Sequence, residues 1–214
     1  MQPKYLTKVL VAASATAISA SQTPAGAGNL LINGGSASGG VATLDTQRQV
    51  LLTFAADETG HTFVVYGTSD GGQAIQESVA GAAATAVTTQ MFKTVTRISI
   101  SAAAAGAITV GTNGVGATPW QIVSADMTPV NLGVGVVVSG TVNFSLQYTY
   151  DDPSGTYPNP AVTFPTVWNL TALASKAVAT DSNITFPIAA YRLLINSGTG
   201  TATATIVQAG IAGN

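Results

Sequence analysis

The stretch GVGVVVSGTVNFSLQYTY, residues 133–150, carries the strongest fold signal in the chain. Apolar residues occupy every second position on both sides of a Ser139-Gly140 pair; they are Val134, Val136 and Val138 before it and Val142, Phe144, Leu146 and Tyr148 after it. Successive side chains of a β-strand point to opposite faces, so a period of two indicates a strand with one buried face. Because Ser-Gly between two such runs favours a tight turn, the stretch predicts a β-hairpin.

The same period recurs upstream. In TRISIS, residues 96–101, polar and apolar residues alternate strictly. Polar, glycine-containing segments at 57–60 and 69–72 are of the kind that closes hairpins. Outside residues 133–150, the expected strands cover 29–32, 49–55, 61–67, 73–79, 92–101 and 107–111. Since nothing after Ala20 has the pattern of a long helix, the chain is predicted to be all-β.

The domain organisation follows from one uncharged, glycine-rich segment. GTNGVGATP at 111–119 predicts an interdomain linker or corner. We therefore expect two small β-sandwich or jelly-roll-like domains in tandem, at 28–112 and 118–214, preceded by an N-terminal arm or short helix at 1–27. Residues 151–165 contain four prolines and are predicted to be a loop.

A weak internal repeat supports two domains. Residues 96–101 with 107–110 resemble residues 191–196 with 202–207. Each copy is an arginine-marked strand, a small-residue turn and a strand of Thr, Val and Ile, so each half is expected to end in the same hairpin. The alternative to duplication is a chance match in so simple an alphabet of residues.

The N-terminal 27 residues fit two structures. Lys4 and Lys8 precede an apolar run over residues 9–20, and Ala25-Gly26-Ala27 resembles a cleavage site, as in a secretory signal. Serine and threonine dilute the run, however, which favours a short helix or arm. The residues near helical spacing are Leu6, Val9, Leu10, Ala13 and Ala17. The run is shorter than the ~20 apolar residues that a membrane span needs.

Charged residues make up 7% of the 214 residues, against roughly 25% in an ordinary globular domain. The seven Lys and Arg residues are scattered, and the net charge is -2, which argues against nucleic-acid binding. A surface so poor in charge favours contact with partner subunits. The alternative is that Thr, Ser, Asn and Gln hydrate the surface without ions. The absence of Cys excludes disulfides, thiolate metal sites and Cys nucleophiles.

Candidate catalytic and metal-binding groups are few. His61 is the only histidine, and GTSDG at 67–71 matches a nucleophile elbow, but that motif precedes a helix and the triad histidine follows it in the chain. Asp57-Glu58 and Asp151-Asp152 lack the spacing of a calcium loop, with Asp151 and Asp152 the better metal candidates. The glycines of 111–116 lack the lysine and helix of a phosphate site. No catalytic, cofactor-binding or metal-binding residue is assigned, and we expect a protein that is not an enzyme.

Aromatic residues offer a different kind of site. The candidates for a sugar-binding platform are Trp120, Trp168, Tyr148, Tyr150 and Tyr157. Packing in the core or between domains is the favoured interpretation, because aromatic side chains chiefly supply buried area. An exposed pair among Trp120, Trp168 and Tyr157 would favour glycan binding, whereas burial of both tryptophans would exclude it.

Several short sequence segments, in their order along the chain, resemble those of a known protein family. They are SQTPAGAGNL at 21–30, GGVATLD at 39–45, FKTVT at 92–96, VGTNGVG at 110–116, Pro119-Trp120, GTV at 140–142 and YTYDD at 148–152, with a looser match from NSGTG at 196–200 to the C-terminus. In these segments the chain resembles a family of structural proteins of tailed-bacteriophage virions. The likeness covers most of residues 21–152 and includes no catalytic motif.

The resemblance implies a structural protein of the particle, most simply a capsid decoration or cement protein on the virion surface, assembled in the host cytoplasm. Its expected partners are the major capsid protein and other copies of itself in a homo-oligomer, with neither nucleic acid nor a membrane. Residues 1–20 are the candidate capsid-binding arm, and the alternative is that they pack on their own domain. The alternative function is a head-fibre or tail component that binds a host glycan; a secreted bacterial adhesin ranks third.

Overall fold

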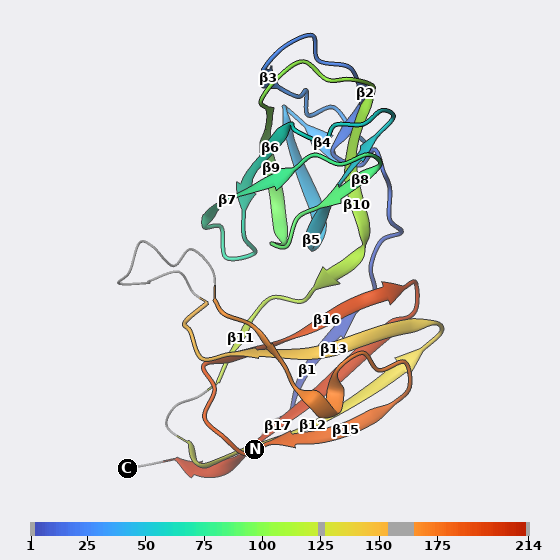
Figure 1. Ribbon diagram of the computed structural model, residues 1–214. Helices are drawn as coiled ribbons and strands as arrows, with labels where there is room; N and C mark the ends of the chain where they lie inside the picture. Colours follow the sequence, from blue (N-terminus) through green and yellow to red (C-terminus); the bar gives the residue numbers. More distant parts are fainter. Residues whose placement is uncertain (1–2, 124–126, 154–164, 213–214) are drawn as a thin grey trace. The chain divides into compact units, whose positions relative to one another are not determined.

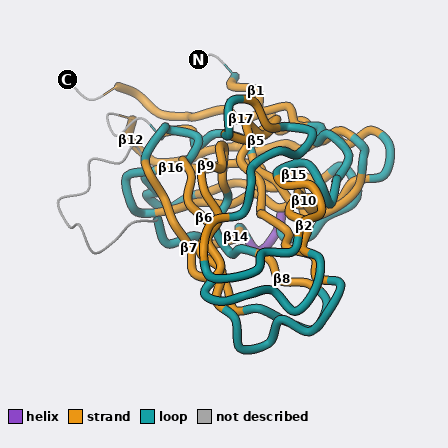
Figure 2. Tube along the Cα trace, turned by 90° about the horizontal axis from the view of Figure 1, so that it is seen from above, coloured by secondary structure: helices purple, strands orange, loops and turns teal. Residues whose placement is uncertain are grey.

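Strands and a single turn of 3-10 helix are the regular structure of the described residues, 3–123, 127–153 and 165–212, in the computed structural model (Figure 1). Figure 2 shows the strands joined by loops, with that one short helical turn in purple. The prediction of an all-β fold is confirmed. The antiparallel sheets are consistent with a β-sandwich-like architecture.

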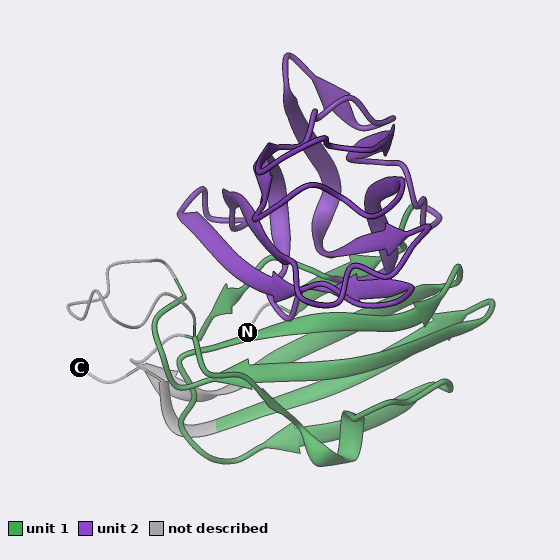
Figure 3. Cartoon of the chain, turned by 45° about the horizontal axis from the view of Figure 1, so that its top comes forward, with its two compact units in different colours: residues 1–11, 117–214 green, residues 12–116 purple. Residues whose placement is uncertain are grey.

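The chain divides into two compact units (Figure 3). Unit 1 comprises residues 1–11 and 117–214, and unit 2 comprises residues 12–116. Unit 2 is therefore an insertion between the first strand of unit 1 and the rest of it. The expected ranges 28–112 and 118–214 lie within units 2 and 1, and the expected arm, 1–27, is divided between the two.

Unit 1 has two sheets. Its strands are β1 (Lys4–Lys8), β11 (Gln121–Ile122), β12 (Met127–Ser139), β13 (Val142–Thr149), β14 (Trp168–Asn169), β15 (Thr180–Ile184), β16 (Ala190–Gly198) and β17 (Thr201–Ala212), with the 3-10 helix η1 at Thr171–Leu173. One sheet has the order β1-β17-β12-β15. In the other, β13 lies between β14 and β16, and β11 pairs with β16.

The core of unit 1 draws on both sheets. Val134 and Val136 of β12 and Ile206 of β17 are buried from one side, and Phe144 and Leu146 of β13 from the other. This alternation is the one that the sequence predicts, and the burial of these residues confirms which face of each strand is apolar.

The predicted hairpin at 133–150 is wrong. β12 pairs with β15 and β17, whereas β13 pairs with β14 and β16, so the chain changes sheets at the turn. Gly140 in this turn has a φ of +74°, a conformation that glycine adopts readily. An arch between two sheets and a hairpin within one sheet both leave every second side chain buried, which is why the pattern did not distinguish them.

The expected terminal hairpins of the repeat are also wrong. β16 and β17 lie in different sheets and are joined by a second arch. In unit 2 the corresponding strands, β9 (Phe92–Ile100) and β10 (Ile108–Ala117), are separated by β5 (Val41–Phe54) in the sheet order. Each copy is thus two strands that do not pair with each other, and whether the two arose by duplication stays a prediction.

The predicted N-terminal helix is replaced by a strand. β1 pairs antiparallel with β17, with Lys4 opposite Ile206 and Lys8 opposite Ala202. Leu6 is buried in the core of unit 1, and so is Leu10 after the strand ends. The four-residue spacing of these leucines suggested a helix, but only Leu6 lies within the strand and faces the core.

Unit 2 is built around a sheet of order β10-β5-β9-β6-β7, where β6 is Thr62–Thr68 and β7 is Ala74–Ala80. The short strands β2 (Ser19–Gln22), β3 (Gly28–Asn29), β4 (Ala37–Ser38) and β8 (Thr85–Val87) attach to β10, β9, β5 and β5 respectively. The turn at 69–72 closes the β6–β7 hairpin, as predicted. Residues 57–60 close no hairpin, because β9 lies between β5 and β6.

The predicted linker at 111–119 is largely strand. β10 continues to Ala117, and unit 2 ends within the expected segment, at Gly116. The two ends of unit 2 lie together: the amide of Thr112 donates to the carbonyl of Ser14 at 2.9 Å, and the amide of Ser14 donates to Oγ1 of Thr112 at 3.3 Å. A Cβ at Gly111 would overlap the Ser14 carbonyl, so this approach needs glycine.

Candidate functional sites

The outward side of the β1-β17-β12-β15 sheet forms the first candidate, which we call the outer face. The residues that face away from the core, according to the register and burial, are Tyr5, Thr7, Gly133, Gly135, Val137, Ser139, Asp181, Asn183, Thr201, Thr203, Thr205 and Val207. Tyr5 is 63% exposed and Val137 64%. Asp181 is the one charged residue among these twelve, so the outer face is apolar and hydroxyl-bearing, with little charge.

Small and hydroxyl-bearing residues make up much of the outer face. A Cβ at Gly135 would meet no atom within 4 Å, because the space above this glycine is open. Oγ1 of Thr203 donates to Oγ1 of Thr7 at 3.2 Å, so hydroxyl groups on neighbouring strands satisfy one another. A face with few charges has a low cost of desolvation when a partner covers it.

Four aromatic side chains form the second candidate, the aromatic cluster: Tyr148, Tyr150, Trp168 and Phe186. Tyr148 and Trp168 are opposite each other in the β13–β14 pair and stack at 6.1 Å with an interplanar angle of 17°. Tyr150 stands at 67° to Trp168, with ring centroids 5.0 Å apart. Phe186 closes the cluster at 5.3 Å from Tyr148.

The cluster has a partly buried base and an exposed top. Tyr148 and Phe186 pack against the core of unit 1, whereas Trp168 is 40% and Tyr150 52% exposed. Desolvation, followed by the charge and hydroxyl of Tyr150, raises the pKa of Tyr148. The hydroxyl of Tyr148 is therefore a neutral hydrogen-bonding group at physiological pH.

Trp120 belongs to a different arrangement. Its ring is half-buried, and the Arg192 guanidinium lies over it at 4.4 Å. Nε of Arg192 also donates to Oε1 of Gln147 at 2.8 Å. Burial lowers the pKa of Arg192 to about 10. Trp120 is thus a packing residue, as the sequence favours, and the structure does not bring it together with Trp168. Tyr157 lies outside the described residues.

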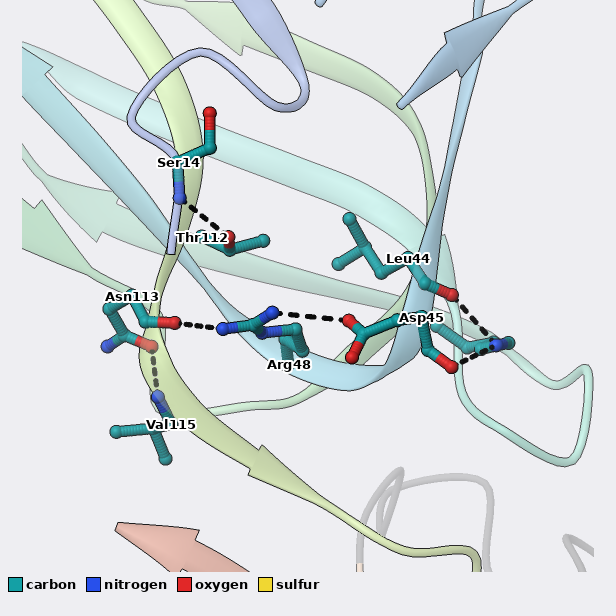
Figure 4. Close-up of polar contacts among 8 residues, drawn as sticks. Ser14, Leu44, Asp45, Arg48, Thr112, Asn113 and Val115 are labelled. Carbon is teal, nitrogen blue, oxygen red and sulfur yellow. Dashed lines mark hydrogen bonds and ion pairs between the residues drawn. The ribbon is translucent and has the colours of Figure 1, made fainter. Parts of the chain in front are cut away.

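The largest fully buried side chain belongs to Arg48 of unit 2 (Figure 4). Its Nη1 contacts Oδ1 of Asp45 at 3.2 Å, and its Nη2 donates to the carbonyl of Asn113 in β10. Nζ of Lys93 donates to the carbonyls of Leu44, at 2.8 Å, and Asp45, at 3.2 Å. These bonds connect β5 to β9 and β10 beside the irregularity that separates Thr43 from Arg48 in the β5–β9 register. Since these bonds tie three strands together around a buried guanidinium, the cluster has a structural role.

His61, the single histidine, pairs with a buried carboxylate. Its Nδ1 lies 2.5 Å from Oε2 of Glu58, whose side chain is fully buried. The other oxygen of Glu58 accepts the amide of Gly106 at 3.0 Å. Both carboxylate oxygens are therefore occupied by groups that hold the loop at 57–60 in place.

The remaining sequence candidates do not converge on one place. Ser69 and Gly72 lie in the β6–β7 hairpin turn, a strand-turn-strand arrangement that differs from a nucleophile elbow. Hydrogen bonds from the Thr59 hydroxyl and then from the Thr59 amide, which donates to Oδ1, lower the pKa of Asp57. Oδ2 of Asp151 accepts the amide of Thr166 at 2.6 Å. Among residues 3–123, 127–153 and 165–212, no three His, Cys, Asp or Glu side chains are grouped so as to hold a metal ion.

The comparisons with known proteins add no assignment. No family model matches the chain, and no curated protein matches it. In the part of the chain that the structure describes, no helix is long and apolar enough to cross a membrane.

Sequence reasoning missed the buried Arg48 and the outer face. Arg48 had one available signal, an acidic residue three positions earlier at Asp45 in a β-rich segment that carries few charges. The outer face had none, because Tyr5 and Val137 become neighbours only through the pairing of β1 and β12 with β17.

Proposed function

We propose that this protein is a non-enzymatic structural protein of a tailed-phage virion, a decoration protein that binds the major capsid protein and stabilises the shell. The observation that carries the proposal is the outer face, twelve residues across four strands with a single charge. Extended surfaces of this kind on soluble proteins are commonly interaction sites. The resemblance of short sequence segments to those of virion proteins supports the major capsid protein as the partner.

The energetics of a capsid favour such a surface. Each copy buries the exposed rings and methyl groups of Tyr5 and Val137 against the shell, at about 25 cal/mol for each Å² of apolar area. Many symmetry-related contacts add their effects, and contacts within a homo-oligomer add avidity. Binding to the assembled shell then stabilises that state by mass action.

The structure changes the way in which the N-terminal segment is to be tested. Removing residues 1–20 would delete β1 and uncover the core positions that Leu6 and Leu10 fill. A truncated chain would fail to bind for the trivial reason that unit 1 is damaged. Single substitutions on the outer face are therefore the better test.

The experiment compares virions made with and without the coding sequence, then adds back variant proteins. Val137→Lys and Tyr5→Lys place a cation on the outer face, and Leu31→Lys, at a position 67% exposed in unit 2, is the matched control. We expect the two outer-face variants to bind undecorated particles at least about tenfold more weakly than the control. Particles without the protein should also melt at a lower temperature.

Two results would reject the proposal. If purified virions contain none of this protein, it is not a component of the particle. If they contain it but particle melting and pressure resistance are the same in its absence, the stabilising role fails.

A second candidate function is a head-fibre or tail component that binds a host glycan. The exposed fractions of Trp168 and Tyr150 favour it, since burial of both tryptophans would have excluded it. The exposed ring beside Trp168 is that of Tyr150, whereas Trp120 is half-buried and Tyr157 lies outside the described residues.

A further inference from the structure

The top of the aromatic cluster presents two ring surfaces that meet at an angle. Trp168 and Tyr150 remain 40% and 52% exposed although their centroids are only 5.0 Å apart, and their planes are inclined by 67°. Unit 1 thus presents two exposed aromatic rings, inclined to each other, at one point on its surface. The residues come from β14 and from the position directly after β13.

This corner is preorganised by the residues beneath it. Tyr148 stacks on Trp168 at 17° and meets Tyr150 edge-on at 5.7 Å. Tyr148 and Phe186 are in turn packed against the core of unit 1. A ligand that binds here does not have to order the rings first, which is the principal cost of recruiting flexible side chains to a site.

The geometry distinguishes between two kinds of ligand. A cage for a quaternary ammonium group needs rings that surround a space large enough for the cation. Here the centroid separations between neighbouring rings are 5.0–6.4 Å, which is the range of rings in direct contact, so no such space lies between them. Open ring faces with tyrosine hydroxyls at the edge suit a flat ligand that is apolar on one side and hydroxyl-bearing at its rim. A pyranose ring has that chemistry.

The charges near the corner indicate a neutral sugar. Asp151 and Asp152 directly follow Tyr150, and their carboxylates accept hydrogen bonds from hydroxyl groups but repel anions. Residues 148–153, 165–170 and 185–188, which carry the aromatic cluster, include no lysine or arginine. An anionic saccharide would find no counter-charge among these residues.

We infer that the corner formed by Trp168 and Tyr150 is a binding site for neutral pyranose units of a glycan. The sugar stacks its C–H face on the Trp168 indole and rests its edge against Tyr150. The inference deepens the second candidate function, and it holds whether or not the outer face binds a capsid.

The test uses the full chain and intrinsic fluorescence. There are two tryptophans, so Trp120→Phe leaves Trp168 as the one emitting indole, directly at the site. The probes are cellohexaose, maltohexaose and lacto-N-tetraose as neutral saccharides, with sialyllactose and hexagalacturonic acid as anionic ones. We expect at least one neutral probe to shift the Trp168 emission and to give saturation-transfer NMR signals from its ring protons.

Substitutions then locate the site. In the otherwise wild-type chain, Trp168→Ala and Tyr150→Ala should each weaken binding by about tenfold or more, measured by the NMR signal. Trp168→Phe keeps a ring and should retain part of the affinity, which separates loss of the platform from loss of the fold. Trp120→Phe should bind as the wild type does, because Trp120 lies under Arg192.

Three results would overturn the inference: none of the neutral probes binds, only the anionic probes bind, or Trp168→Ala binds as tightly as the wild type while showing the wild-type unfolding curve. Decoration of particles by Trp168→Ala is measured in parallel. Normal decoration with lost sugar binding separates this site from the capsid contact, and failure of decoration alone leaves the sugar result unaffected.

Discussion

The amide of Gly200 donates a hydrogen bond of 2.8 Å to the carbonyl of Thr141, joining the two places where the chain of unit 1 passes from one sheet to the other. The amide of Thr199 donates to the same oxygen at 3.1 Å. One carbonyl in the β12–β13 arch thus holds the β16–β17 arch by two bonds. These two backbone hydrogen bonds link the arches at that end of the two-sheet core.

Gly200→Ala should destabilise unit 1. A Cβ at this position would overlap the Ser139 carbonyl and the backbone of residues 140 and 141, which cannot move without breaking both bonds to Thr141. We expect a loss of about 2 kcal/mol in the free energy of unfolding, measured by urea denaturation.

Gly135→Ala is the matched control for that substitution, since a Cβ there would enter open space on the outer face. Its expected effect is neutral to slightly stabilising, because alanine in a strand has less conformational freedom to lose than glycine. Equal losses in the two variants would contradict the role assigned to the arch contact.

Arg48→Met should destabilise unit 2 by about 2 kcal/mol, since it removes the ion pair of a buried guanidinium with the partly exposed Asp45 and leaves the Asn113 carbonyl without its donor. Arg97→Met is the comparison: Arg97 is exposed and lies over the Tyr66 ring at 3.7 Å, so its loss should cost under about 1 kcal/mol. Thermal or chemical unfolding of both variants measures the difference. A larger loss at Arg97 would rule out this account of the Arg48 cluster.

Tyr150→Phe should lower the pKa of Tyr148 toward its ordinary value, because two of the three causes that raise it involve Tyr150. With a folded-state pKa above the unfolded one, the contribution of this proton to stability is present at neutral pH and is lost as the pH rises through the folded pKa. In Tyr150→Phe, the stability that the Tyr148 proton contributes should therefore be lost at a lower alkaline pH than in the wild type. NMR titration of the Tyr148 ring measures the change.

The pKa of Tyr191 provides the internal reference for that titration. Burial alone raises it, so it should be the same in the wild type and in Tyr150→Phe. A parallel change in both tyrosines would indicate a general loosening of unit 1 instead of a local effect.

Residues 12–116 should fold in isolation. Their two ends are already joined by the paired bonds between Ser14 and Thr112, and strands β5, β6, β7 and β9 lie wholly within this range. We expect dispersed amide signals in NMR and a cooperative unfolding transition. A spectrum typical of an unfolded chain would show that unit 2 depends on unit 1.

Sequence reasoning predicted burial better than it predicted pairing. The period of two placed Val136 and Phe144 correctly on apolar faces, but it is a property of one strand and contains nothing about which strand lies alongside. The hairpin at 69–72 was predictable because its pairing is local and its turn needs a glycine, Gly72, with a φ of +81°.

The candidate sites were predictable only in part. Trp168 and Tyr148 were recognised as candidates from residue type, yet their stacking depends on the pairing of β13 with β14, across a proline-rich segment whose length does not specify a register. The helical interpretation of the N-terminal segment gave no indication that Tyr5 lies on the face of a sheet. Its place on the outer face requires β17, almost the whole chain away.

That distance imposes an order on synthesis. The ribosome makes β1 before unit 2 and makes its partner β17 after unit 2. Unit 2 is complete once residue 116 has emerged, whereas the sheet of unit 1 has to wait for β17, and long-range strand pairing is intrinsically slow. During that interval Leu6 has no core to enter. A nascent chain whose strand β1 stays unpaired until β17 has been made is vulnerable to aggregation and proteolysis during that interval.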